Sequence, residues 1–76
     1  AMAQLLKLVA PGMMRAARAL LGRLHPDFDD VVQQSLIALV QAMPTFRMEC
    51  SPQHFANSIV TRFALASRRR EAKRDE

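Results

Sequence analysis

The 76-residue sequence contains no tryptophan or tyrosine, a single cysteine and only two glycines. One cysteine, Cys50, cannot form a disulfide within the chain, which fits a reducing compartment such as the cytoplasm. No apolar run approaches the roughly 20 residues needed to cross a bilayer, and no signal-peptide pattern is present. A glycine-rich phosphate loop, a Cys/His ligand cluster and a serine–histidine–aspartate set are also missing, so we expect no enzyme, no metal and no cofactor.

Alternating runs of β-branched residues, typical of strands, are absent too, whereas helix-forming residues are abundant. Half of the residues are hydrophobic, which suffices for one small core. The formal charge of +4 favours an anionic partner. We therefore expect an all-α, compact three-helix bundle over residues 1–70, followed by a charged tail or the start of a linker over residues 71–76.

Residues 3–24 are helical in composition, with an interruption at Pro11 and Gly12. The apolar positions with helical spacing are Leu6, Val9, Met13, Ala17, Leu20 and Leu24. A proline inside a helix costs about 3 kcal/mol, but little at a first helical position. We expect a break or sharp kink near Ala10 and a second segment from Pro11 to Leu21, ended by Gly22. A solvated basic side is formed by Lys7, Arg15 and Arg18.

The stretch from Asp27 to Met43 has the spacing of one amphipathic helix. Its apolar face comprises Phe28, Val31, Val32, Leu36, Leu39, Val40 and Met43. We expect Asp27 to cap this helix by accepting hydrogen bonds from first-turn amides, and Pro44 to end it. The opposite side carries one apolar residue, Ile37, among four polar ones: Asp30, Gln33, Gln34 and Gln41. This arrangement suits a protein-binding hot spot, but single exposed aliphatic residues are common, and the pattern leaves both interpretations open.

Ser51 and Pro52 predict the start of a last helix, which we expect to end near Arg70. Its core face would hold Phe55, Ala56, Ile59, Phe63 and Ala66, and its opposite face His54, Asn57, Ser58, Thr61, Leu65, Arg68 and Arg69. No acidic residue lies between Glu49 and Glu71, although solvated helices usually mix Glu with Lys. An acid-free face that leads into three arginines favours a polyanion, while arginines also stabilise a helix C-terminus.

Three blocks of the sequence resemble region two of bacterial RNA polymerase sigma factors, most closely of the extracytoplasmic-function (ECF) type. They are DDVVQQ at 29–34, MPTFRMECS at 43–51, and the helix from Phe55 to Arg70. The family reads roughly E-D-L-V-Q-E, then L-P-x-F-R-G-E, then W-L-x-x-I-A-x-N-x-A and a basic run. The resemblance covers about Leu5 to Arg70, with the blocks in the family's order and spacing.

The resemblance implies a transcription initiation factor that binds core RNA polymerase and recognises and helps melt the promoter −10 element as single-stranded DNA. The polymerase-binding residues would be those of the central helix that docks on the coiled coil of the largest subunit: Asp30, Gln33, Gln34, Ile37 and Gln41. The loop would hold a flipped base, and the last helix would follow the non-template strand. The DNA-binding residues would be Arg47, Met48, Glu49, Cys50, Ser51, His54, Asn57, Ser58, Thr61, Arg62, Arg68, Arg69 and Arg70. Since relatives are often held by an anti-sigma protein, such a partner and a cytoplasmic location are further expectations.

The sequence departs from the family pattern at four positions. Gln34 replaces Glu, Met48 replaces Gly, Phe55 replaces Trp, and Arg62 stands where Asn is common. Without Trp or Tyr, we do not expect strand opening by large aromatic wedges, and base capture in the loop would have to replace it. The second helical domain of such factors is also absent, so we expect either an excised domain, which the linker-like residues after Arg70 favour, or an unusual short form. The alternative function is a helical protein-interaction or adaptor domain with an incidental basic tail, which leaves the acid-free face unexplained.

Overall fold

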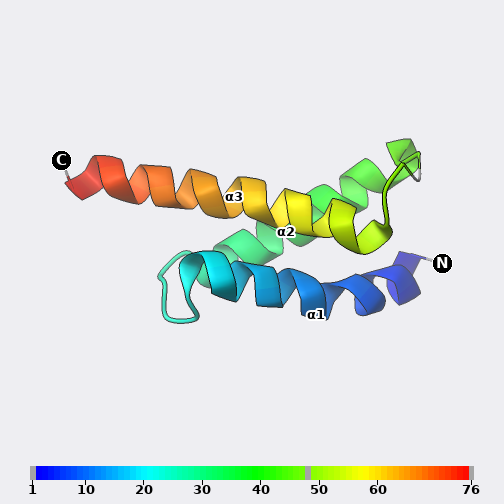
Figure 1. The fold of residues 1–76 in the computed structure, drawn as a ribbon, viewed down its shortest axis with the longest axis horizontal. Helices are drawn as coiled ribbons and strands as arrows, with labels where there is room; N and C mark the ends of the chain where they lie inside the picture. The colour runs from blue at the N-terminus through cyan, green and yellow to red at the C-terminus, as the bar shows by residue number, and fades with distance from the viewer. Residues whose placement is uncertain (1, 48, 76) are drawn as a thin grey trace.

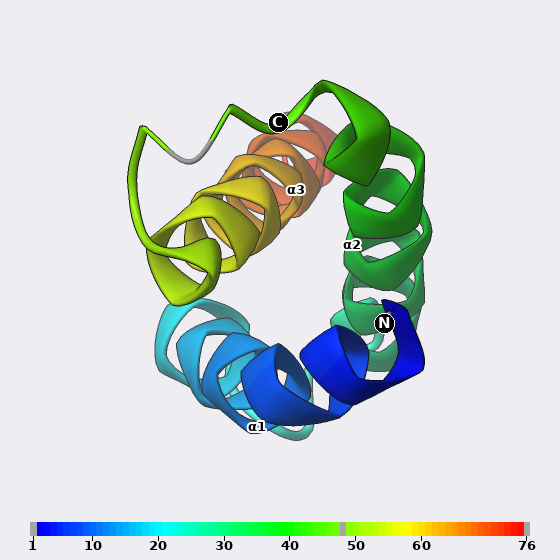
Figure 2. The same cartoon turned by 90° about the vertical axis from the view of Figure 1, so that its right-hand side faces the viewer.

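The computed structural model describes residues 2–47 and 49–75, and these form a bundle of helices (Figure 1). The long helices are α1 (Met2–Leu21), α2 (Phe28–Ala42) and α3 (Pro52–Asp75), and the 3-10 helix η1 (Met43–Thr45) follows α2. Viewed along the bundle, α1, α2 and α3 stand at the corners of a triangle, and each packs on the other two (Figure 2). The predicted all-α three-helix bundle is therefore confirmed.

The core lies between the three helices and is made of small and medium-sized side chains. Its buried hydrophobic residues are Val9, Met13 and Ala17 of α1, Phe28, Val31 and Leu39 of α2, and Ala56, Ile59, Val60 and Ala64 of α3. The residues from α1 are spaced four apart, so they form one stripe along that helix. Three fully buried alanines let the helix backbones approach closely, which compensates for the absence of large aromatic residues.

Two predicted positions of the apolar pattern do not reach this core. Leu24 is 96% exposed because Gly22, with a φ of 88°, ends α1 before it. The Gly22 amide donates to the Arg18 carbonyl at 2.9 Å, as in a left-handed helix cap. Val40 is 41% exposed, since it lies at the edge of the apolar face of α2. In α3 the buried stripe is rotated from the predicted one: Val60 and Ala64 are buried, whereas the aromatic rings are only partly covered.

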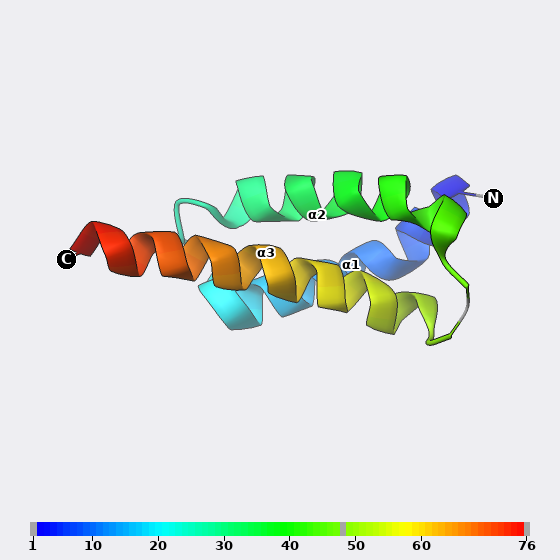
Figure 3. The same cartoon turned by 90° about the horizontal axis from the view of Figure 1, so that it is seen from above.

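Of the break or kink predicted near Ala10, the break does not occur, since α1 is one helix with Pro11 inside it. The ribbon instead bends in its N-terminal turns (Figure 3). Next to the proline, the Gln53 amide nitrogen of α3 donates to the Val9 carbonyl at 3.1 Å. Gly12 makes room for this contact, because a Cβ atom there would lie 2.3 Å from the same nitrogen. A side chain of α3 thus packs against α1 beside the proline.

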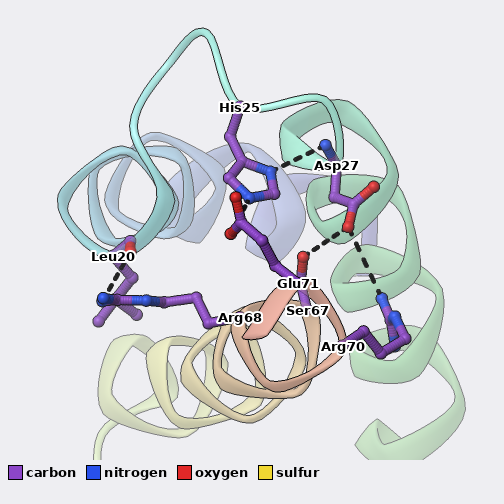
Figure 4. A network of polar contacts seen from close by, with 7 residues as sticks. All are labelled: Leu20, His25, Asp27, Ser67, Arg68, Arg70 and Glu71. Atoms are coloured by element: carbon purple, nitrogen blue, oxygen red, sulfur yellow. Dashed lines mark hydrogen bonds and ion pairs between the residues drawn. The ribbon is translucent and has the colours of Figure 1, made fainter. Parts of the chain in front are cut away.

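The carboxylate of Asp27 does not cap α2 in the way the sequence predicts. Asp27 occupies the N-cap position, but its side chain makes no capping hydrogen bond. Its Oδ2 atom accepts instead from the Ser67 hydroxyl at 2.6 Å and lies 4.0 Å from the Arg70 guanidinium (Figure 4). The negative charge still lies at the positive end of the α2 dipole. A partner 40 residues away has therefore replaced the local one.

The last helix does not end near Arg70 but continues to Asp75, and its final part is held against the loop 22–27. The His25 Nδ1 atom accepts from the Asp27 amide at 3.0 Å, so the Nε2 atom carries the proton in the neutral ring. Nε2 donates to the Glu71 carboxylate at 3.0 Å (Figure 4). The start of the charged segment 71–76 is thus helical and makes a side-chain contact with the loop.

Candidate functional site

The outer face of α2 is the first candidate surface, and it is directed away from both other helices (Figure 2). The five residues predicted to bind a partner there are all exposed: Asp30, Gln33, Gln34, Ile37 and Gln41. Ile37 stands out with 58% of its surface exposed. The structure therefore brings together one apolar side chain and four hydrogen-bonding side chains on one face of α2, over successive turns of the helix.

Ile37 is not isolated, because neighbouring apolar residues extend its surface. A shallow hollow of about 330 Å³ is lined by Leu36, Ile37, Val40 and Gln41. Val40, which we predicted to be in the core, belongs to this surface instead. An apolar centre inside a polar rim is the common anatomy of a protein interface. The hollow favours the hot-spot interpretation over a single stray aliphatic residue.

The loop between η1 and α3 forms the second candidate surface. Phe46 is directed inward and stacks on Phe55 at the start of α3, with ring centroids 4.6 Å apart and an interplanar angle of 27°. Beside this stack lies an open cavity of about 220 Å³, and its lining also includes Thr45, Arg47, Glu49 and Cys50. Met48, predicted to bind DNA, lies outside the described residues. A cavity with an aromatic wall and a nearby arginine has the chemistry that an unstacked base requires.

Ser51 fixes the direction in which α3 leaves this loop. Its hydroxyl oxygen accepts from the His54 amide at 3.1 Å, and Pro52 is the first residue of the helix, as predicted. The predicted polar face then follows, with His54 and Ser58 exposed and Asn57 and Thr61 half-buried. The Ser58 and Thr61 hydroxyls donate to carbonyls of their own helix, at 2.7 and 2.9 Å. Their oxygens can still accept a hydrogen bond from a ligand.

The basic residues of α3 fall into two groups. Arg68 donates to the Leu20 carbonyl at the end of α1, at 3.4 Å, and Arg70 lies near Asp27 (Figure 4). Arg62 and Arg69 are exposed, and within the described residues they make no hydrogen bond or ion pair. Arg62 and Arg69 are seven residues apart and thus share one face of the helix. The predicted run of three arginines is therefore divided between internal contacts and the free surface.

Gln53 is a site residue that our sequence interpretation missed. Its amide nitrogen donates to the Asn57 side-chain oxygen at 2.9 Å as well as to the Val9 carbonyl. The signal was present as a Gln–Asn pair spaced four residues apart on a predicted polar helix face. Its second partner, in α1, could not be inferred from spacing within α3.

Groups that would support catalysis or membrane insertion were sought in the same residues. Within 2–47 and 49–75, no group of three or more His, Cys, Asp or Glu side chains is placed to hold a metal ion. No described helix is both long and apolar enough to span a membrane. The candidate surfaces are therefore the α2 face, the loop cavity and the acid-free face of α3.

Together these features define a helical domain with one candidate protein-binding face and one candidate face for a polyanion. The family model of sigma-70 region 2 matches residues 5–74, which is almost the whole chain. The chain therefore belongs to the sigma-70 family and is a region 2 domain, a part of a transcription initiation factor. Such domains bind RNA polymerase and recognise the promoter −10 element. Searches of curated proteins and of solved structures gave no significant match.

Proposed function

We propose that this chain is region two of an ECF-type sigma factor, which docks on the largest-subunit coiled coil of RNA polymerase through α2 and holds the −10 element as single-stranded DNA. The observation that carries the proposal is Ile37, 58% exposed inside a ring of polar side chains. The outer positions of a coiled coil carry mostly polar and charged side chains, which the polar side chains around Ile37 can match. A factor of this kind would act in the cytoplasm, where polymerase and DNA are found.

The DNA-binding half of the proposal uses the loop cavity and the exposed face of α3. The cavity beside the Phe46–Phe55 stack is the proposed place for a base flipped out of the duplex. Flipping costs a few kcal/mol, and stacking on an aromatic ring offsets part of this cost. Arg47 and Cys50 line the same cavity and would contact the captured nucleotide. Because the chain has no Trp or Tyr, this capture would take the place of a wedge of large aromatic residues.

Phosphates of the non-template strand would be held by arginines that have no internal partner. Among the described arginine side chains of α3, Arg62 and Arg69 meet this condition, whereas Arg68 and Arg70 already contact Leu20 and Asp27. We therefore assign the first phosphate contacts to Arg62 and Arg69, and the helix-stabilising role to Arg68 and Arg70. Arg68 and Arg70 could still add long-range attraction, because both are exposed.

The test of the polymerase contact is capture of core RNA polymerase by the tagged chain. We expect the wild type to capture polymerase and the Ile37→Asp variant to lose at least tenfold in affinity, because a charge would be desolvated at the centre of the interface. The matched control is Leu24→Asp, which places the same charge at another exposed aliphatic residue, in the loop 22–27. Circular dichroism would verify that both variants are folded.

Two outcomes would contradict this assignment. If Ile37→Asp and Leu24→Asp capture polymerase equally well, the docking face does not lie on α2. No capture by the folded wild type would favour the alternative of an adaptor domain with another protein partner.

A further inference from the structure

The outer side of α1 carries a row of exposed side chains that the proposed function does not use. Its members follow the spacing i, i+4, i+7 and i+11, which puts them on one side of the helix. We call this row the α1 stripe, and it consists of Gln4, Leu8, Pro11 and Arg15. Leu8 is 72% exposed, and the exposed Arg15 side chain makes no hydrogen bond or ion pair among the described residues. The α1 stripe thus offers an apolar and a basic side chain to a partner molecule.

The outer face of α2 carries a row with the same spacing. This α2 stripe consists of Asp30, Gln34, Ile37 and Gln41, and all four residues are exposed. Ile37 follows Asp30 by seven residues, as Arg15 follows Leu8, so on both helices an apolar and a charged side chain lie about 10 Å apart. The Asp30 carboxylate, like the Arg15 guanidinium, has no hydrogen bond or ion pair within the described part of the chain. The two stripes therefore have equal spacing and opposite charge.

The two stripes match when the helices that carry them run antiparallel. In this register Asp30 lies opposite Arg15, and Ile37 lies opposite Leu8. The other two pairs join Gln34 with Pro11 and Gln41 with Gln4, so that no like charges meet. Rows with steps of three and four residues are those that interlock when helices pack, and antiparallel helices bring opposite ends of their dipoles together.

The charge of each whole helix favours the same pairing. The segment 2–21, which forms α1, contains three basic residues and no acidic one. The segment 28–42, which forms α2, contains two acidic residues and no basic one. The outer surfaces of the two helices thus attract each other when they belong to different copies of the chain.

The helix α3 is also basic, but its exposed face does not fit the α2 stripe. Its exposed large apolar residue is Leu65. Seven residues away from Leu65 in either direction stand Ser58 and Ala72, and neither is basic. A register that brings Ile37 onto Leu65 would therefore leave Asp30 without a cation. Within this chain, α1 is the better partner for α2.

We propose that this chain self-associates by docking the α2 stripe of one copy, antiparallel, on the α1 stripe of a second copy. The contact joins two different surfaces, so each pair keeps one free stripe of each kind and association continues beyond the dimer as concentration rises. Each stripe covers only about 16 Å of helix, and every copy has a formal charge of +4. Association is therefore weak and requires a high protein concentration.

A covered α2 stripe is closed to other proteins. Since Ile37 is central to this contact and to the proposed docking on RNA polymerase, self-association would exclude polymerase binding. This consequence rests on the proposed function, whereas the self-association does not.

The test is sedimentation velocity of the 76-residue chain at concentrations from about 10 μM to about 1 mM. We expect the mean sedimentation coefficient of the wild type to rise with concentration. Arg15→Asp and Asp30→Arg should each weaken association at least about tenfold, because like charges then face each other. The variant with both substitutions restores opposite charges and should associate within about threefold of the wild type.

The matched control is Lys7→Asp, which makes the same change of charge on the same helix outside the α1 stripe and should associate like the wild type. Circular dichroism would verify that each variant is folded. A wild type that stays monomeric up to about 1 mM would overturn the inference and leave the α1 stripe to a partner other than this chain. Equal weakening by Lys7→Asp and Arg15→Asp, or no recovery in the double variant, would overturn the pairing of Arg15 with Asp30.

Capture of core RNA polymerase separates this inference from the proposed function. Arg15→Asp keeps the α2 stripe intact, so at about 1 mM it should capture more polymerase than the wild type, whose α2 stripe is then covered. Equal capture by both proteins at every concentration would show that self-association does not cover α2. If the wild type associates but neither protein captures polymerase, self-association stands and the proposed docking face fails.

Discussion

Replacing Asp27 by alanine should destabilise the domain by about 2–3 kcal/mol, mainly through the Ser67 hydroxyl. Ser67 is fully buried, and its hydroxyl donates to the Asp27 carboxylate at 2.6 Å. A buried hydroxyl without an acceptor costs about 1–3 kcal/mol, and the lost charge at the α2 N-terminus adds about 0.3–1 kcal/mol. The Arg70 contact adds little, because it is 4.0 Å long and the Arg70 side chain is 54% exposed.

This loss is large for a domain of 76 residues. Total stability at this size is about 4–11 kcal/mol, and 1 kcal/mol corresponds to a shift of about 4–8 °C in melting temperature. We therefore expect the Asp27→Ala variant to melt at least 8 °C below the wild type in thermal unfolding followed by circular dichroism.

A double-mutant cycle with Ser67→Ala tests the reason for this loss. Once the hydroxyl is removed, alanine at position 27 no longer leaves a buried donor unsatisfied, so the double variant should be more stable than the sum of the two single losses by about 1–2 kcal/mol. If the losses of the two single variants add up to that of the double variant within about 0.5 kcal/mol, the coupling is refuted. The effect of Asp27 would then come from the helix dipole or from the other contacts of Asp27.

Two further predictions concern the contact of Gly12 with Gln53 and the cap at the start of α3. Gly12→Ala should gain about 1 kcal/mol in a Gln53→Ala background through helix propensity and gain nothing in the wild type, where the added Cβ displaces the Gln53 amide. Urea unfolding would check this, and equal effects in both backgrounds would show that Gln53 does not fill the space beside Gly12. Ser51→Ala should cost about 1 kcal/mol, because the His54 amide loses its cap. A Ser51→Asp variant should keep the stability of the wild type, because aspartate can also cap the helix. An unchanged stability of Ser51→Ala would mean that the cap is not formed in solution.

The sequence predicts this fold well wherever a boundary depends on local chemistry. Gly22 ends α1, Pro44 follows the end of α2, and Ser51 with Pro52 starts α3, because each signal acts within one turn of backbone. The exposed α2 face was also predictable, since helical geometry alone puts Ile37 opposite the buried residues Val31 and Leu39.

Two of the wrong predictions have the same physical cause, which is a partner far along the chain. Asp27 gives up its local capping bonds for Ser67, 40 residues away, and His25 holds Glu71 across 46 residues. Helix periodicity contains no information on such pairs. It also cannot divide a run of arginines into those that bind a neighbouring helix and those that stay free.

The two ends of the bundle also differ in their polar contacts. At the end that holds the loop 22–27, Arg68 and Arg70 are occupied with α1 and Asp27, so that α3 is anchored there (Figure 4). At the other end, two cavities lie beside the first turns of α3, one at the loop before that helix and one between α3 and α1. A strand bound at that end would meet a helix already fixed at its far end. The conformational entropy lost on binding would then come mainly from the DNA and the loop, and α3 would serve as a rigid support.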